Sequence, residues 1–388
     1  MKITIVTGPF LSVPPAPCGA VERVWRDLAA EFAADQHDVT VICRYHDELA
    51  SGSVSDGVTI KPVRGFLSGN YMPLNLIKDF FYGLRVACAL EKSDVIVTNT
   101  FFLPMILGVL RRGAGPVHVH VARMPKGQMN YYMKAGVKQL SALSSAVRDE
   151  IGKESPEAQA ATHTVSNPIR TNVFKPPVTP RRHPRRRILY TGRIHPEKGL
   201  VSLVKAVASL KKDYPDLSLR LIGPWKIDEG GGGKVYVDQL KSLATGGFLE
   251  FREAIYDREK LRDALYEGDL YCYPSVAERG ETFGVAPLEA MGTGLPIIVS
   301  NLSCFRDFVE DGKTGLVFDH RSGDPVGALR TAILRMLSDE ALANSIAEAG
   351  ANTAAAFTIR NTAEKYEELF RSLINEEANQ KKRSRQTA

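Results

Sequence analysis

Short β-branched segments alternate with helical stretches along this chain, and the alternation occurs twice. The segments of the first half are Lys2–Val6, Asp38–Ile42, Thr59–Val63, Asp94–Val97, Val117–Val121 and Thr162–Val165. Those of the second half are Ile188–Thr191, Ser218–Ile222, Leu249–Phe251, Leu270–Tyr273, Pro296–Val299 and Gly315–Phe318. Such segments, separated by helical patterns, predict parallel sheets with crossover helices. We therefore expect an α/β protein with two parallel-sheet domains that face each other across a cleft.

A proline-rich stretch separates the two halves. Residues Asn167–Pro184 contain five prolines and show no hydrophobic periodicity, which is typical of a linker. After Leu337 the sequence is amphipathic and helical, and its periodicity does not say which domain it packs against. The boundaries that we expect are 1–170 for the first domain, 171–186 for the linker, 187–355 for the second domain, 356–375 for a C-terminal helix and 376–388 for a disordered basic tail.

Composition limits where such a protein acts. Of its 388 residues, 44% are hydrophobic and 24% charged, which is typical of a soluble globular protein. Five cysteines without a CxxC pair favour a reducing, cytoplasmic location. The net charge of +6 is concentrated at Arg181–Arg187 and Lys381–Arg385. These segments fit solvated linkers or a peripheral contact with the inner face of a membrane, and no aromatic-plus-basic stripe points to nucleic acid.

The segment from Tyr273 to Ile297 carries the strongest chemical signal. It reads as a strand, a loop and a helix, and Pro287 fits a helix only in its first turn, so the helix begins near Phe283 or Gly284. The free N–H groups of that turn suit a phosphate. Glu281 and Glu289 flank the turn, and carboxylates can accept hydrogen bonds from a sugar or ribose diol. Each glutamate by itself also fits a plain structural role, as a helix-start charge or a surface residue.

A second signal follows the first strand of the second half. Arg193 and Lys198 lie in a glycine-flanked turn, Gly192-Arg193 to Lys198-Gly199. Two cations at the ligand end of a βα unit match a diphosphate, whose added negative charge on departure would strengthen these bonds in the transition state. The alternative is a helix start with two exposed cations, which is unfavourable without an anion.

These motifs resemble those of the family-four retaining glycosyltransferases, whose signature is two glutamates separated by seven residues, as in Glu281 and Glu289. The resemblance implies the GT-B fold, with two Rossmann-like domains and the active site between them. It also implies a role for each site residue. Arg193 and Lys198 would hold the donor diphosphate, Glu281 the transferred sugar and Glu289 the ribose, with backbone N–H groups near Phe283, Gly284 and Val285. The C-terminal helix would return to the first domain.

The first half resembles the family less closely. The family's glycine-rich loop followed by glutamate corresponds to Cys18-Gly19-Ala20-Val21-Glu22, and Gly19 is the residue that we assign to donor binding. In the strand Val117–Val121, His120 matches a histidine near the reacting centre. His118 and His120 point to the same face of that strand. One alternative is that the two histidines bind zinc, but no third ligand occurs at a recognisable spacing. The other alternative is that His120 is a core or surface histidine.

The resemblance implies transfer with retention of the anomeric configuration, with Glu281, His120, Arg193 and Lys198 as the catalytic set. The chain contains no Asp-x-Asp motif, so we expect no metal and no other cofactor. The expected donor is a UDP-sugar. The acceptor is unidentified; the first-domain residues Arg111, Arg112, Arg123, Lys126, Tyr131, Tyr132 and Lys134 suit a lipid-linked or phosphorylated one, as in surface polysaccharide assembly. The rival functions are a nucleotide-sugar epimerase, a glycan phosphorylase and a non-catalytic sugar-nucleotide-binding protein.

Overall fold

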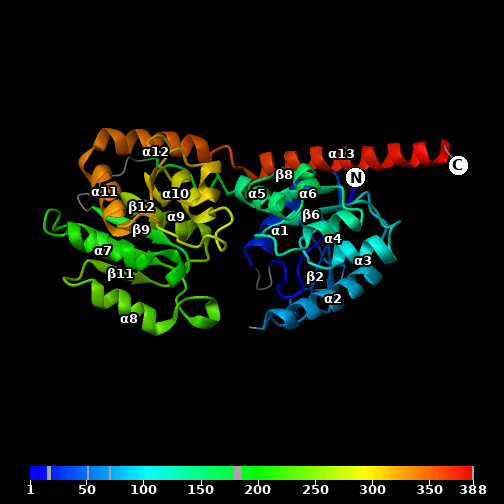
Figure 1. Ribbon diagram of the computed structural model, residues 1–388, viewed down its shortest axis with the longest axis horizontal. Coiled ribbons are helices and arrows are strands. Elements are labelled where there is room, and N and C mark those ends of the chain that lie inside the picture. The colour runs from blue at the N-terminus through cyan, green and yellow to red at the C-terminus, as the bar shows by residue number, and fades with distance from the viewer. Residues whose placement is uncertain (15–18, 50–51, 70, 179–185, 387–388) are drawn as a thin grey trace. The chain divides into compact units, whose positions relative to one another are not determined.

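The computed structural model describes residues 1–14, 19–49, 52–69, 71–178 and 186–386. The chain forms two compact units, drawn in Figure 1. The first comprises Met1–Pro168 together with Ile359–Ala388, and the second comprises Ile169–Thr358. Each is a sheet with helices on both faces (Figure 1), which is the architecture that the alternating pattern predicts.

The first unit contains an eight-stranded sheet in the order β3-β4-β2-β1-β5-β6-β7-β8. Its pairs are parallel except β3 with β4. The strands are β1 (Lys2–Val6), β2 (Asp38–Arg44), β3 (Val54–Ser55), β4 (Val58–Val63), β5 (Val95–Thr98), β6 (Val117–Val121), β7 (Gln139–Ala142) and β8 (Thr162–Thr164). The helices are α1 (Ala20–Ala34), α2 (Met72–Ala89), α3 (Leu103–Leu110), α4 (Met129–Lys134), α5 (Ser145–Glu154), α6 (Pro156–Ala160) and α13 (Ile359–Gln386).

The two faces of this sheet bury different helices because successive strand residues point to opposite sides. Ile3 and Ile5 pack in one core with residues of α1 and α13. Val6 and Ile42 pack on the other face with α2 and α3. The last helix, drawn in red in Figure 1, therefore belongs to the core of the first unit.

The second unit contains a six-stranded parallel sheet in the order β11-β10-β9-β12-β13-β14. Its strands are β9 (Arg187–Thr191), β10 (Ser218–Ile222), β11 (Leu249–Arg252), β12 (Leu270–Tyr273), β13 (Ile297–Ser300) and β14 (Leu316–Phe318). Its α-helices are α7 (Leu200–Leu210), α8 (Gly233–Leu243), α9 (Arg258–Tyr266), α10 (Val285–Gly292), α11 (Pro325–Ser338) and α12 (Glu340–Ala354). Short 3₁₀ turns occupy η1 (Pro196–Lys198), η2 (Ile227–Glu229) and η3 (Ser303–Asp307).

The structure differs from the sequence expectations at five places. Strands β3 and β7 were not predicted; β7 reads Gln-Leu-Ser-Ala and lacks the β-branched residues that mark a strand. The tail expected to be disordered continues α13 as far as Gln386. The expected linker begins inside the second unit, because Ile169 and Phe174 are buried there; the arginines of its basic run that precede Arg186 lie outside the described residues. The last helix begins at Ile359 rather than at residue 356.

Candidate functional site

The loop after β9 is built on two glycines in the left-handed region. Gly192 has φ +142° and Gly199, which precedes α7, has φ +67°. A Cβ on Gly199 would lie 2.0 Å from the carbonyl oxygen of Pro274, so no larger residue fits between this loop and the one after β12. The amide of Val276 also donates to the Glu197 carbonyl over 2.9 Å. The two predicted motif loops are therefore packed against each other.

Lys198 and Glu281 form a buried ion pair where these loops meet. The Nζ of Lys198 lies 2.7 Å from Oε2 of Glu281, and the two side chains are 6% and 10% exposed. The same ammonium group lies 5.5 Å from the centre of the Tyr273 ring, close enough for a cation–π contact. Tyr273 stacks on Tyr190 with a centroid separation of 5.5 Å. Nothing in the sequence marks these tyrosines as site residues, because an aromatic residue in a buried strand is usually a core residue.

Arg193 has a different environment from Lys198. Its guanidinium forms an ion pair with Glu197 and donates to the Gly230 carbonyl over 2.9 Å. Arg193 thereby contacts the glycine-rich loop between β10 and α8. The Arg193 side chain is 42% exposed, so it is more accessible to an anion than Lys198, which is 6% exposed.

The loop after β12 ends at Gly284, and α10 begins at Val285, as the position of Pro287 predicts. Gly284 has φ +96°, and a Cβ there would lie 2.6 Å from Cε1 of Phe305. Only glycine combines this backbone with that close approach. Phe283 is buried against Phe308 and Phe357, so its ring anchors the helix start. The first amides of α10 have no intrahelical acceptor and can donate to an anion.

Glu289 lies inside α10 and forms an ion pair with Arg258 at the start of α9. The Nη1 of Arg258 is 3.1 Å from Oε1 of Glu289, and the Glu289 side chain is 10% exposed. Arg258 was not predicted, since it follows the helix-capping residue Asp257 and nothing in the local pattern marks it. The second unit thus places both predicted glutamates in ion pairs, each with a different cation.

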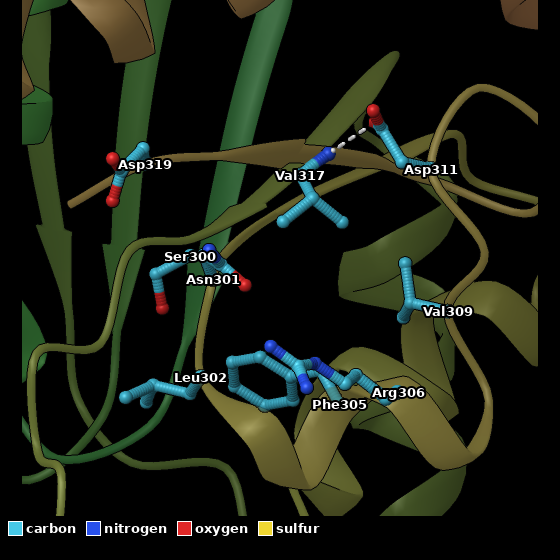
Figure 2. Close-up of a pocket in the computed structure, with 9 residues that line it drawn as sticks. All are labelled: Ser300, Asn301, Leu302, Phe305, Arg306, Val309, Asp311, Val317 and Asp319. Atoms are coloured by element: carbon cyan, nitrogen blue, oxygen red, sulfur yellow. Dashed lines mark hydrogen bonds between the residues drawn. The ribbon is translucent and has the colours of Figure 1, made fainter. Parts of the chain in front are cut away.

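A cavity of about 330 Å³ lies at the carboxyl ends of β13 and β14, and Figure 2 draws the side chains that line it. Its lining residues are Ser300, Asn301, Leu302, Phe305, Arg306, Val309, Asp311, Val317 and Asp319. None of them is a predicted site residue. Phe305 connects this cavity to the predicted site, because its ring also fills the space beside Gly284 and contacts Tyr273 at 6.0 Å between centroids.

Gly19 and His120 belong to the first unit. Gly19 precedes α1, and a Cβ there would lie 2.6 Å from Oε2 of Glu22, so the absence of a side chain lets Glu22 fold back on the loop. Burial raises the pKa of Glu22, while hydrogen bonds from backbone amides and the charge of Arg123 oppose the shift. Cys18 lies outside the described residues.

His120 lies near the carboxyl end of β6 and is buried. Its Nδ1 is 3.0 Å from the hydroxyl of Tyr366 on α13 and 3.1 Å from Oγ of Ser141 on β7. Burial lowers the pKa of His120 to about 3, so the ring is neutral near pH 7. His118 uses both ring nitrogens on Gln139 and Ser141, which leaves neither for a metal. In the part of the chain that the structure describes, no three metal-ligating side chains are gathered.

Two family models match most of the chain. The model described as glycosyl transferases group 1 matches residues 174–353, and the glycosyl transferase 4-like domain matches residues 19–185. A phosphatidyl-myo-inositol mannosyltransferase of Mycobacterium leprae is 32% identical over 168 residues, which are 42% of this chain and 40% of that protein. A D-inositol 3-phosphate glycosyltransferase of Corynebacterium urealyticum is 31% identical over 190 residues, 47% of this chain and 42% of that protein. The match thus spans about two fifths of each of these relatives.

Solved structures match over nearly the whole chain. A sucrose-phosphate synthase from Thermosynechococcus elongatus has a TM-score of 0.79 at 19% identity and covers 97% of this chain and 100% of its own. The HepE protein of Anabaena, solved with UDP and glucose, has a TM-score of 0.71 at 18% identity, with coverage of 96% and 100%. The chain therefore belongs to the family-four glycosyltransferases and has the GT-B fold.

Proposed function

We propose that this protein is a retaining glycosyltransferase that transfers a sugar from a UDP-sugar to an acceptor without a metal ion. The observation that carries the proposal is the buried pair of Lys198 and Glu281 beside the start of α10. In a site without ligand, each charge neutralises the other. A donor supplies a further partner to each: its diphosphate to the ammonium group, which has three donors, and its sugar hydroxyls to the carboxylate, which can accept several hydrogen bonds.

In this proposal each site residue has a separate role in the transfer. Lys198, Arg193 and the first amides of α10 hold the diphosphate and stabilise the charge that it gains on leaving. Glu281 accepts hydrogen bonds from the transferred sugar, and Glu289 from the ribose. We also assign Gly19 of the first unit to donor binding, although the Glu22 carboxylate fills the space beside its Cα in this structure. The bond between the anomeric carbon and the phosphate oxygen breaks as the acceptor oxygen attacks on the same face, and the acceptor proton passes to the departing phosphate.

Binding of the donor is the first test. A panel of nucleotide sugars is screened by thermal shift, since a ligand that binds only the folded protein raises its Tm. We expect a UDP-sugar to give the largest rise, as the HepE complex with UDP suggests. The Glu289→Gln variant should lose that rise. If no nucleotide sugar raises the Tm, the proposal is wrong.

Product analysis then separates the rivals. Transfer to an acceptor with retained anomeric configuration supports the proposal, whereas isomerised donor points to an epimerase, phosphate-dependent glycan cleavage points to a phosphorylase, and binding without turnover points to a non-catalytic protein. EDTA should leave the rate unchanged. Loss of activity in EDTA, restored by magnesium or manganese, would overturn the metal-independent mechanism.

We propose further that the protein contacts the membrane where a lipid-linked acceptor resides, during surface polysaccharide or glycolipid assembly. Four cations line one hollow of the first unit, namely Arg111, Arg112, Lys134 and Lys138. Tyr131 and Val109, on the neighbouring helices α4 and α3, are 60% and 73% exposed. Such a mixture of cations and exposed apolar side chains fits an anionic lipid surface.

This hollow lies at the amino ends of β6 and β7, whereas His120 lies near the carboxyl end of β6. Arg111 and Lys134 are therefore candidates for lipid contact rather than for acceptor contact, in contrast to Arg123 and Lys126, which follow β6. The test is co-sedimentation with vesicles of neutral or anionic lipid; equal binding to both would contradict the proposal. Within the described residues, no helix combines the length and the apolar character that a membrane crossing needs.

A further inference from the structure

A continuous chain of buried polar side chains connects the last helix to His120. It starts at the Leu369 carbonyl of α13, which accepts a hydrogen bond from Nε2 of Gln139 over 2.9 Å. Oε1 of Gln139 is 2.8 Å from Nδ1 of His118, and Nε2 of His118 is 2.8 Å from Oγ of Ser141. Ser141 and Tyr366 then both contact Nδ1 of His120.

The Leu369 carbonyl fixes the direction of the first hydrogen bonds, because a carbonyl can only accept. The Gln139 amide must therefore present its NH₂ to Leu369 and its oxygen to His118. His118 consequently donates from Nδ1. Burial lowers the pKa of His118 to about 4, so its Nε2 carries no proton and accepts the hydroxyl hydrogen of Ser141.

This leaves Ser141 as an acceptor toward both His120 and Tyr366. The Ser141 oxygen lies 3.1 Å from Nδ1 of His120 and 3.3 Å from the Tyr366 hydroxyl. If Nδ1 carries the proton of His120, that single N–H is shared between the oxygens of Ser141 and Tyr366, and the Tyr366 O–H points at Ser141, so each of the three contacts contains a hydrogen. If Nε2 carries it instead, lone pairs of Nδ1 and Ser141 face each other, which is unfavourable.

We propose that Ser141 and Tyr366 are positioning residues that fix His120 in the neutral tautomer protonated at Nδ1, so that Nε2 is a bare hydrogen-bond acceptor. Within the described residues, Nε2 has no hydrogen-bond partner. The Trp25 ring meets the His120 ring edge-on at 5.1 Å and holds its plane. This inference rests on the proposed function: with Nε2 bare, His120 accepts a hydrogen bond from a substrate hydroxyl and does not donate a proton.

The tautomer can be measured without any substrate. In protein labelled with ¹⁵N-histidine, long-range ¹H–¹⁵N correlation spectra distinguish a protonated from a bare ring nitrogen, and the His120→Gln variant identifies the His120 signals among the eight histidines. We expect a protonated Nδ1 and a bare Nε2 at pH 7. A proton on Nε2 of the unmodified protein would overturn the proposal.

Two variants test the positioning residues. Ser141→Ala removes the acceptor, so Tyr366 should donate to Nδ1 and the proton should move to Nε2. Tyr366→Phe should keep the proton on Nδ1 but leave the His120 ring less firmly held. We expect kcat to fall about tenfold, which corresponds to the loss of one hydrogen bond, while the KM for the donor stays nearly unchanged. Tyr82→Phe is the matched control, since Tyr82 is equally buried in this unit and its hydroxyl has no partner among the described residues.

The outcomes separate this inference from the proposed function. Unchanged His120 signals in Ser141→Ala, or an unchanged kcat in Tyr366→Phe, would contradict the positioning role. If the spectra show the expected tautomer but no donor is ever turned over, the inference about His120 stands and the transferase proposal fails.

Discussion

The two units hold their candidate site residues by opposite means. In the second unit, Lys198 and Glu281 are charged and bonded to each other on glycine turns between strands and helices. In the first unit, His120 is neutral and held by a network of uncharged side chains from β6, β7 and α13. An ion pair can exchange its partners for those of a charged ligand, whereas the hydrogen bonds of a neutral network hold one geometry. The comparison suggests a second-unit site that rearranges on binding and a first-unit site that is preorganised.

The largest effect should come from removing the cation of the ion pair. Lys198→Ala should abolish transfer, because the diphosphate loses its buried positive charge. It should also lower the free energy of unfolding by about 3 kcal/mol, since Glu281 is left buried without its partner. Transfer assays and denaturant melts measure the two effects.

The double variant Lys198→Met with Glu281→Gln separates the role of the ion pair in catalysis from its role in the stability of the fold. It removes both charges, so stability should recover while transfer stays absent. Recovery of transfer in the double variant would show that the pair has only a structural role.

A smaller effect is expected at the start of α10. Gly284→Ala should destabilise the second unit by about 2–4 kcal/mol, because a left-handed backbone disfavours any side chain and the new methyl group would meet the Phe305 ring. Gly312→Ala is the control: its φ is +75°, but nothing lies within 4 Å of the added carbon. The difference between the two variants in denaturant melts isolates the clash. Equal losses would mean that Phe305 moves away freely.

The last prediction concerns pH and tests whether His118 and His120 stay neutral. The pKa of His118 is lowered to about 4 and that of His120 to about 3, from an unfolded value of 6.5. Below pH 6.5 the unfolded chain therefore binds more protons than the folded one, so the free energy of unfolding should fall as the pH drops from 6.5 toward 4. The double variant His118→Gln with His120→Gln should show a flatter dependence in melts at pH 7 and pH 5. An equal slope would assign the acid sensitivity to other groups.

Local chemistry explains which features could be predicted. The start of α10 follows from Gly284 and Pro287, whose backbone preferences act within one turn, and the structure begins that helix at Val285. Strand β7 was missed because Gln139 and Ser141 carry no strand signal. They are stabilised in the sheet by pairing with β6 and by hydrogen bonds to His118 and α13, partners that are distant in sequence.

The sequence by itself determined the two parallel sheets, the glycine turns and the family, since periodicity, backbone preference and motif spacing are local properties of the chain. Only the tertiary structure decided that Lys198 pairs with Glu281, that Arg258 pairs with Glu289, and that Tyr366 of the last helix reaches His120. These contacts join residues as far as 246 positions apart. Tertiary packing, rather than any local preference, brings such residues together, so local sequence patterns cannot predict these contacts.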